Sequence, residues 1–306
     1  MIALVGVALG FRALRTLIPP PLFGTEDTQL LFVGTSHVGD GIAYTRMPWP
    51  TAMLAHAGAD QRLLTKAFLE HRERWPRLRV AVVEVDEVSL VGDRFWTQRF
   101  DLSATCGELD LDAHQLPSSR AEPVRLAWVA WNLARGRGFS ALHASRRLTL
   151  ETVRRLLASP RGPWRPEKSS PNQVSTSSIS VARTREGLAR LERDAVEPSA
   201  NVRALGELVA ALEASGVRVV LLSLPQHPAY LGLRPERFVR ATRAALDEVR
   251  KVSRTEPTVW DDRGMSLTDE DFTNATHLSS LGAARYASLL SRRLSCLGAL
   301  AGECLE

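Results

Sequence analysis

Two short stretches, near opposite ends of the chain, hold the side chains whose types could do chemistry. Ser36 follows an apolar run over 30–33 and a Gly-Thr turn. A serine hydroxyl is a weak nucleophile until a base removes its proton. His277 is of the residue type that most often acts as such a base. The pair predicts acyl transfer through a serine, on condition that the fold brings the two side chains together.

The residues around each side chain favour a common position at one edge of a sheet. The run 30–33 indicates a short buried strand, and Ser36 then stands at its carboxyl end, where open α/β sheets bind ligands. His277 lies just before a helix that Ser279 or Ser280 would cap. Its ring can therefore hang from the loop over the same edge of the sheet.

Strand and helix patterns alternate along most of the chain. A helix that stops at Gly216 and leads into a buried strand is typical of a βαβ crossover and favours a parallel sheet. Residues 39–50 are expected to form a loop, because Pro48 and Pro50 bar a helix. Further strands are expected from Thr51 and over 78–85, 217–224 and 258–260, and helices over 61–74, from Val202 to Leu212, and over 234–252 and 281–294.

Length and composition bound the organisation of the chain. With 306 residues, of which 44% are hydrophobic, the chain can bury the core of a single α/β domain over 29–306, with a variable insertion at about 92–196. The net charge of +5 comes mainly from scattered arginines. No basic run is interleaved with aromatic residues, so a nucleic-acid partner is not expected, whereas mild attraction to anionic envelope polymers stays open.

The N-terminus and the cysteines bear on location. Residues 1–28 form an apolar segment that we interpret as a membrane anchor, the remnant of one, or a helix lying on the domain, because Arg12 and Arg15 interrupt it before the roughly 20 apolar residues that a span needs. Cys296 and Cys304 would close a small loop in an oxidising compartment, and free thiols are the alternative. No cysteine or histidine spacing indicates a metal site, and no cofactor is expected.

The order of these motifs resembles the SGNH/GDSL hydrolase superfamily. That family carries Gly-x-Ser after the first strand, here at 34–36, and Phe-x-Asp-x-x-His-Leu-x-x-x-Gly-Ala near the C-terminus, here at 272–283. The branch most similar to this chain acts at the cell envelope and includes the D-alanyl-lipoteichoic acid and alginate O-acetylation proteins. The resemblance extends from about Gln29 to Arg293. It implies a three-layer α/β/α sandwich with a mostly parallel five-stranded sheet, similar to SGNH hydrolases and flavodoxin-like proteins.

The resemblance implies a role for each motif residue, and two positions depart from the family. Ser36 would be the nucleophile and His277 the base, with the N–H groups of Ser36 and Gly58 stabilising the oxyanion. The family aspartate that orients the histidine is replaced by Asn274, which can accept a hydrogen bond but has no charge. Asp271 could take its place, or a Ser-His dyad could suffice.

The family also completes its oxyanion hole with an asparagine after the third strand. Here the corresponding residues 84–87 are Glu-Val-Asp-Glu, and carboxylates repel an oxyanion, so we interpret them as loop caps. Gly58 could instead belong to a plain turn in which Asp60 caps the next helix. His227, at the end of the fourth strand, is either a substrate-binding residue or a structural loop residue.

Two functions follow as expectations. The first is a serine-dependent esterase or O-acyltransferase that acts on acyl esters of an envelope glycan, a lipid or a small molecule. The alternative is a catalytically impaired protein that binds acyl-glycan or assists a membrane acyltransferase, favoured by Asn274 and by the missing asparagine. Under either function, the expected partners of the protein are an acyl ester, a polysaccharide and, through the N-terminus, a membrane. The family analogy favours a membrane-attached or exported protein, with a cytoplasmic location left open.

Overall fold

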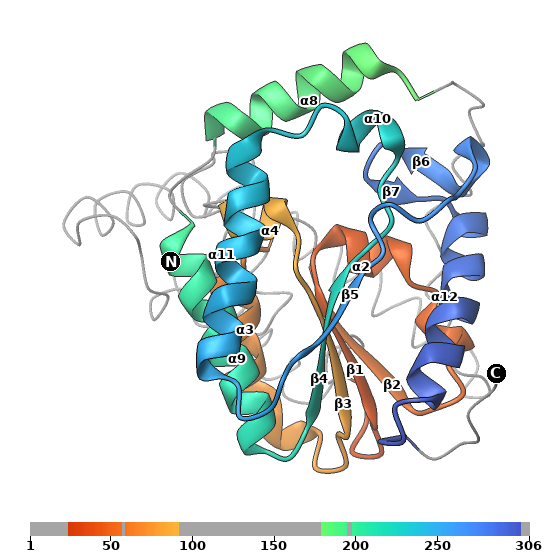
Figure 1. The fold of residues 1–306 in the computed structure, drawn as a ribbon. Coiled ribbons are helices and arrows are strands. Elements are labelled where there is room, and N and C mark those ends of the chain that lie inside the picture. Colours follow the sequence, from red (N-terminus) through yellow and green to blue (C-terminus); the bar gives the residue numbers. More distant parts are fainter. Residues whose placement is uncertain (1–23, 57–58, 92–178, 195–197, 301–306) are drawn as a thin grey trace, which may run out of the picture.

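A five-stranded parallel sheet forms the centre of the protein (Figure 1). The computed structural model describes residues 24–56, 59–91, 179–194 and 198–300. All neighbouring strands pair in parallel, in the order β2-β1-β3-β4-β5, which confirms the predicted parallel sheet. The strands are β1 (Leu30–Gly34), β2 (Thr51–Ala55), β3 (Val80–Glu84), β4 (Arg218–Ser223) and β5 (Thr258–Asp261).

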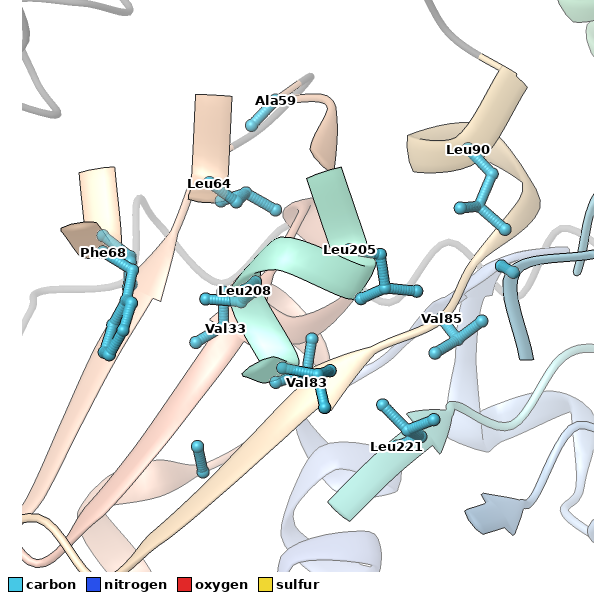
Figure 2. Packing of buried hydrophobic residues seen from close by; sticks show 14 of the residues in the cluster. Val33, Ala59, Leu64, Phe68, Val83, Val85, Leu90, Leu205, Leu208 and Leu221 are labelled. Atoms are coloured by element: carbon cyan, nitrogen blue, oxygen red, sulfur yellow. The ribbon is translucent and has the colours of Figure 1, made fainter. Parts of the chain in front are cut away.

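The central strands are buried on both faces, as their continuous apolar sequence requires. Alternate residues of β1 point to opposite sides, so that Leu31 and Val33 enter one core and Leu30 and Phe32 enter the other. Figure 2 shows the first of these cores, in which Leu205 and Leu208 pack over Val33 and Val83. A strand with two apolar faces needs cover on both sides, and helices supply it.

Helices lie on both faces of the sheet (Figure 1). One face is covered by α3 (Gln61–His71), α4 (Glu87–Val91), α9 (Ser199–Ala214) and α11 (Glu236–Val252), and the other by α2 (Ser36–Gly41) and α12 (Ser280–Ser295). Gly216, with a φ of 74°, ends the turn between α9 and β4 in the left-handed conformation that glycine tolerates. The remaining described helices are α8 (Val181–Asp194), α10 (Pro228–Leu231) and the 3₁₀ turns η2 (Tyr44–Arg46), η3 (Arg72–Arg74) and η5 (Asp269–Asp271).

A small hairpin joins η5 to α12. Its strands β6 (Phe272–Asn274) and β7 (His277–Leu278) pair antiparallel, and Ser279 then caps α12 by accepting from the N–H of Gly282. The helix starts so close to η5 that a Cβ on Gly282 would collide with the backbone carbonyl of Asp271. A glycine at this position therefore lets α12 and the hairpin be held against each other.

Three of the expectations need comment. The loop predicted over 39–50 is wrong in its first part, because α2 extends to Gly41 and η2 forms a further turn before Pro48. The helix predicted over 61–74 ends at His71 and continues as η3. Of the predicted insertion over 92–196, residues 92–178 and 195–197 lie outside the described part, as do residues 1–23.

Two observations bear on the ends of the chain. Within the residues that the structure describes, no helix combines the length and the apolar character needed to cross a membrane. Cys296, just after α12, is disulfide-bonded, and the two cysteines that could be its partner, Cys106 and Cys304, both lie outside the described residues.

Candidate active site

The fold places Ser36 at the carboxyl edge of the sheet, where the strand order reverses. In the sheet, β1 has β2 on one side and β3 on the other, so the chain changes direction across the sheet at β1. Ligands of open α/β sheets bind outside the carboxyl ends of the strands at such a point. β1 ends at Gly34, and Ser36 is the first residue of α2, with Thr35 as its cap. Because the first N–H groups of a helix have no partner within the helix, the N–H of Ser36 can serve an incoming oxyanion.

Ser36 and His277 are brought together from positions 241 residues apart. The Nε2 atom of His277 lies 2.9 Å from the hydroxyl oxygen of Ser36. Both side chains are only partly buried, so the pair is reachable from outside. The strand β7 supplies the histidine and the start of α2 supplies the serine, so the fold brings together the two motifs that the sequence indicates.

Asn274 orients the ring of His277. Its side-chain oxygen lies 3.1 Å from Nδ1 of His277 and also accepts from the backbone N–H groups of Thr276 and His277, at 2.9 and 3.0 Å. An amide oxygen can only accept a hydrogen bond, so the Nδ1 atom that faces it must carry the proton. Nε2 then carries the lone pair that can take the proton of the Ser36 hydroxyl.

Asp271 is engaged elsewhere. One of its oxygens accepts from the N–H and the hydroxyl of Thr268, both at 3.0 Å, and forms the capping box of η5. The carboxylate also pairs with Arg285 at 2.8 Å. This buried aspartate therefore fixes η5 against α12 instead of orienting His277, and the group beside the ring is the neutral amide of Asn274.

A buried cluster of charged side chains lies next to the pair. His37, which follows Ser36, points its Nδ1 at Glu84 and Asp86, at 3.1 and 2.8 Å. Glu84 also accepts from the backbone N–H and the hydroxyl of Thr35, so it holds the turn between β1 and α2. The His37 ring packs edge-on against the His277 ring, with 4.5 Å between their centroids.

The charges of this cluster shift the pKa values of both His37 and His277. Burial alone would lower the pKa of His37, but the charges and hydrogen bonds of Asp86 and Glu84 outweigh burial and raise this pKa well above its ordinary value. In turn, His37 lowers the pKa of Asp86 against the opposing effect of burial. Burial and then the positive charge of His37 lower the pKa of His277 to about 4, although the charge of Asp86 opposes both.

The sequence does not reveal this cluster, because no histidine spacing indicates a site and residues 84–87 are expected to act as loop caps. Asp86 does cap the start of α4, by accepting from the N–H of Val88 at 3.1 Å. The signal that could have found the cluster is topological: β1 and β3 pair in register, so the residues just after each strand must meet.

His37, Glu84 and Asp86 also form the group of described residues that lie close enough to hold a metal ion, with their donor atoms within 4.8 Å of one another. The raised pKa of His37 favours a proton on its Nδ1 atom, between the two carboxylates. Beside the cluster lies a cavity of about 10 Å³, lined in part by Ser223 and Gln226, which is at the lower limit for holding one water molecule. We therefore describe the cluster as an ion pair.

Two further candidates from the sequence remain, His227 and Gly58. His227 accepts from the N–H of Ala229 with Nδ1, as the cap of α10, and its Nε2 lies 3.1 Å from Asp269. Both ring nitrogens are thus used in holding a loop, the structural alternative considered for this residue. Gly58 lies outside the described residues.

No family model matches the chain, and no curated protein matches it.

Proposed function

We propose that this protein is an SGNH-like, serine-dependent esterase or O-acyltransferase. The observation that carries the proposal is the 2.9 Å contact between the hydroxyl of Ser36 and Nε2 of His277. It stands at the carboxyl edge of a parallel sheet, with Asn274 behind the imidazole ring. A nucleophile, a base within hydrogen-bond reach and a third group that orients the base are the parts that acyl transfer through serine requires.

The proposed reaction has two halves. The Ser36 oxygen attacks the ester carbonyl while Nε2 of His277 takes its proton, and the N–H of Ser36 stabilises the oxyanion. The ester C–O bond then breaks, and His277 returns the proton to the leaving alcohol. In the second half, water or an acceptor hydroxyl attacks the acyl-Ser36 ester, giving a free acid or a new ester and restoring the serine.

Asn274 gives a specific reason to keep a second candidate. The amide orients the ring but adds no negative charge to stabilise the imidazolium. The carboxylates of Glu84 and Asp86 also stand where the family has an oxyanion-hole asparagine. A protein that binds an acyl-glycan, or that assists a membrane acyltransferase without turning over the ester itself, is therefore the alternative.

For location and partners, we propose an exported or membrane-attached protein whose substrate is an acyl ester of an envelope glycan, a lipid or a small molecule. The disulfide at Cys296 supports an oxidising compartment, where disulfides persist. The net charge of +5 is compatible with anionic envelope polymers.

Hydrolysis of p-nitrophenyl acetate and butyrate tests the proposal. We expect turnover by the 306-residue chain that falls at least ~1,000-fold in Ser36→Ala, because the nucleophile is lost. Ser288→Ala is the matched control, because this α12 hydroxyl only bonds the carbonyl of Ala284. Turnover that is equal in wild type and Ser36→Ala would refute the esterase proposal. Absence of turnover, together with acyl-glycan binding that survives Ser36→Ala, would favour the alternative.

A further inference from the structure

When two imidazole rings are in edge-on contact, protonation of both to imidazolium cations costs free energy. The centroids of His37 and His277 lie 4.5 Å apart in a partly desolvated site, where like charges repel strongly. We therefore expect one ring to be a positively charged imidazolium and the other to be a neutral imidazole. The surroundings of the two rings decide which is which.

The His37 ring is built to keep its proton. It is buried, and its Nδ1 lies within 3.1 Å of two buried carboxylates, Glu84 and Asp86. A buried carboxylate without a compensating charge is costly, so the imidazolium and the two carboxylates stabilise one another. The His277 ring, by contrast, faces the neutral side chains of Asn274 and Ser36.

We propose that His37 is a positioning residue for the reaction proposed above: a charged neighbour that keeps His277 as the neutral base that Ser36 needs. This inference rests on the proposed function for its purpose, although the electrostatic relation itself does not need turnover. A base held neutral in this way stays available in acid. Once it has taken the serine proton, it is also a strong acid toward the leaving oxygen.

The charged groups around the two rings come from α2 and from the end of β3 and the residues just after it. α2 contributes His37, β3 contributes Glu84, and Asp86 follows β3; the charges of both carboxylates act on His37. Of the charges that act on His277, that of His37 is the larger and that of Asp86 opposes it, while the hairpin that carries His277 adds the neutral Asn274 and Thr276. Glu87, beside Asp86, is paired with Arg234 and Arg263 at 2.6 and 3.3 Å.

The test is an NMR titration of the histidine rings in the 306-residue chain and in His37→Gln. In wild type we expect His277 to titrate below its ordinary range and below His37. In His37→Gln the pKa of His277 should rise by about one to two units, because a unit positive charge has been removed from contact. His227→Gln is the matched control, since its ring bonds Asp269 and should leave His277 unchanged.

An unchanged His277 titration in His37→Gln would overturn the inference. If that variant does not fold, the order of titration in wild type decides: a His277 that gains its proton before His37 as pH falls would also overturn it. The readout needs no ester turnover. An inactive protein with the expected titrations would refute the proposed function alone, whereas an active protein with ordinary titrations would refute this inference alone.

Discussion

At the scale of single residues, the site depends on a neutral partner for its base. The oxygen of Asn274 lies within 3.2 Å of four donors, namely the backbone N–H groups of Thr276 and His277, the Thr276 hydroxyl and the ring Nδ1. These contacts fix the ring so that Nε2 faces Ser36. Asn274 thus fixes the orientation of the ring, and the imidazolium formed during the reaction must be stabilised without a carboxylate behind it.

Asn274→Asp is predicted to be a gain of function. An aspartate can accept from the same four donors and adds a negative charge beside the ring, which stabilises the imidazolium. Hydrolysis of p-nitrophenyl butyrate should accelerate by at least ~10-fold, since one pKa unit corresponds to that factor. Asn274→Ala, which removes orientation and charge together, should lower the rate. An Asn274→Asp protein no faster than wild type would show that no charge is missing at this position.

The pH dependence of the wild-type reaction follows from His277. Its pKa is lowered to about 4 by burial and by the charge of His37. The base must be neutral to accept a proton, so kcat/KM should be retained above this pKa and fall as the pH drops through it. A rate profile measured from pH 3 to 8 checks this expectation. An acidic limb near the ordinary histidine pKa of about 6.5 would contradict it.

At the scale of elements, the hairpin β6–β7 is held in place by the start of α12. Gly282 lies against the backbone of Asp271, whose carboxylate is fixed by Thr268 and Arg285. The Gly-Ala of the C-terminal motif therefore has a packing reason: it lets the helix approach the segment that leads to His277.

Gly282→Ala should both destabilise the protein and weaken the site. The new Cβ would meet a backbone carbonyl, which can move only with η5, so we expect a loss of about 2–4 kcal/mol in the free energy of unfolding. Gly187→Ala is the matched control, because a Cβ there meets nothing within 4 Å and should stabilise α8 by up to ~1 kcal/mol. Urea unfolding compares the two variants, and equal midpoints would contradict this account of the glycine.

The helices and strands were largely predictable from the sequence, whereas the contacts between side chains of different elements were not. The strand at 30–33 is marked by an unbroken apolar run, and the α9–β4 turn by Gly216, because burial and backbone conformation leave local signals. The helical turns of α2 leave a weak signal, since they are short and rich in glycine. The contact of His37 with Glu84 depends on the pairing of β1 with β3, a long-range event that no local pattern encodes.

At the scale of the whole molecule, the sheet gathers residues from distant parts of the chain at one edge. β1 delivers Ser36 and His37, and the neighbouring β3 delivers Glu84 and Asp86. The hairpin then covers them with His277, some 240 residues further on. The buried His37 cluster thereby links the stability of the entire fold to pH.

His37 should make the fold less stable at alkaline pH. Because its folded-state pKa is raised, its contribution to stability is fully present below the unfolded value of about 6.5 and is lost as pH rises through the folded-state pKa. The difference in unfolding free energy between wild type and His37→Gln should therefore shrink as pH rises from 6 to 9.5. Urea unfolding at fixed ionic strength measures it, and a difference that grows with pH would contradict the ion-pair assignment.

The central claim is that Ser36 is activated by His277, and covalent labelling with a fluorophosphonate tests it most directly. Intact-mass and peptide mass spectrometry should find one phosphonyl group per chain, located on Ser36, with the label lost in Ser36→Ala and strongly slowed in His277→Gln. Labelling on another residue, or a rate on Ser36 that does not change when His277 is replaced, would contradict the account.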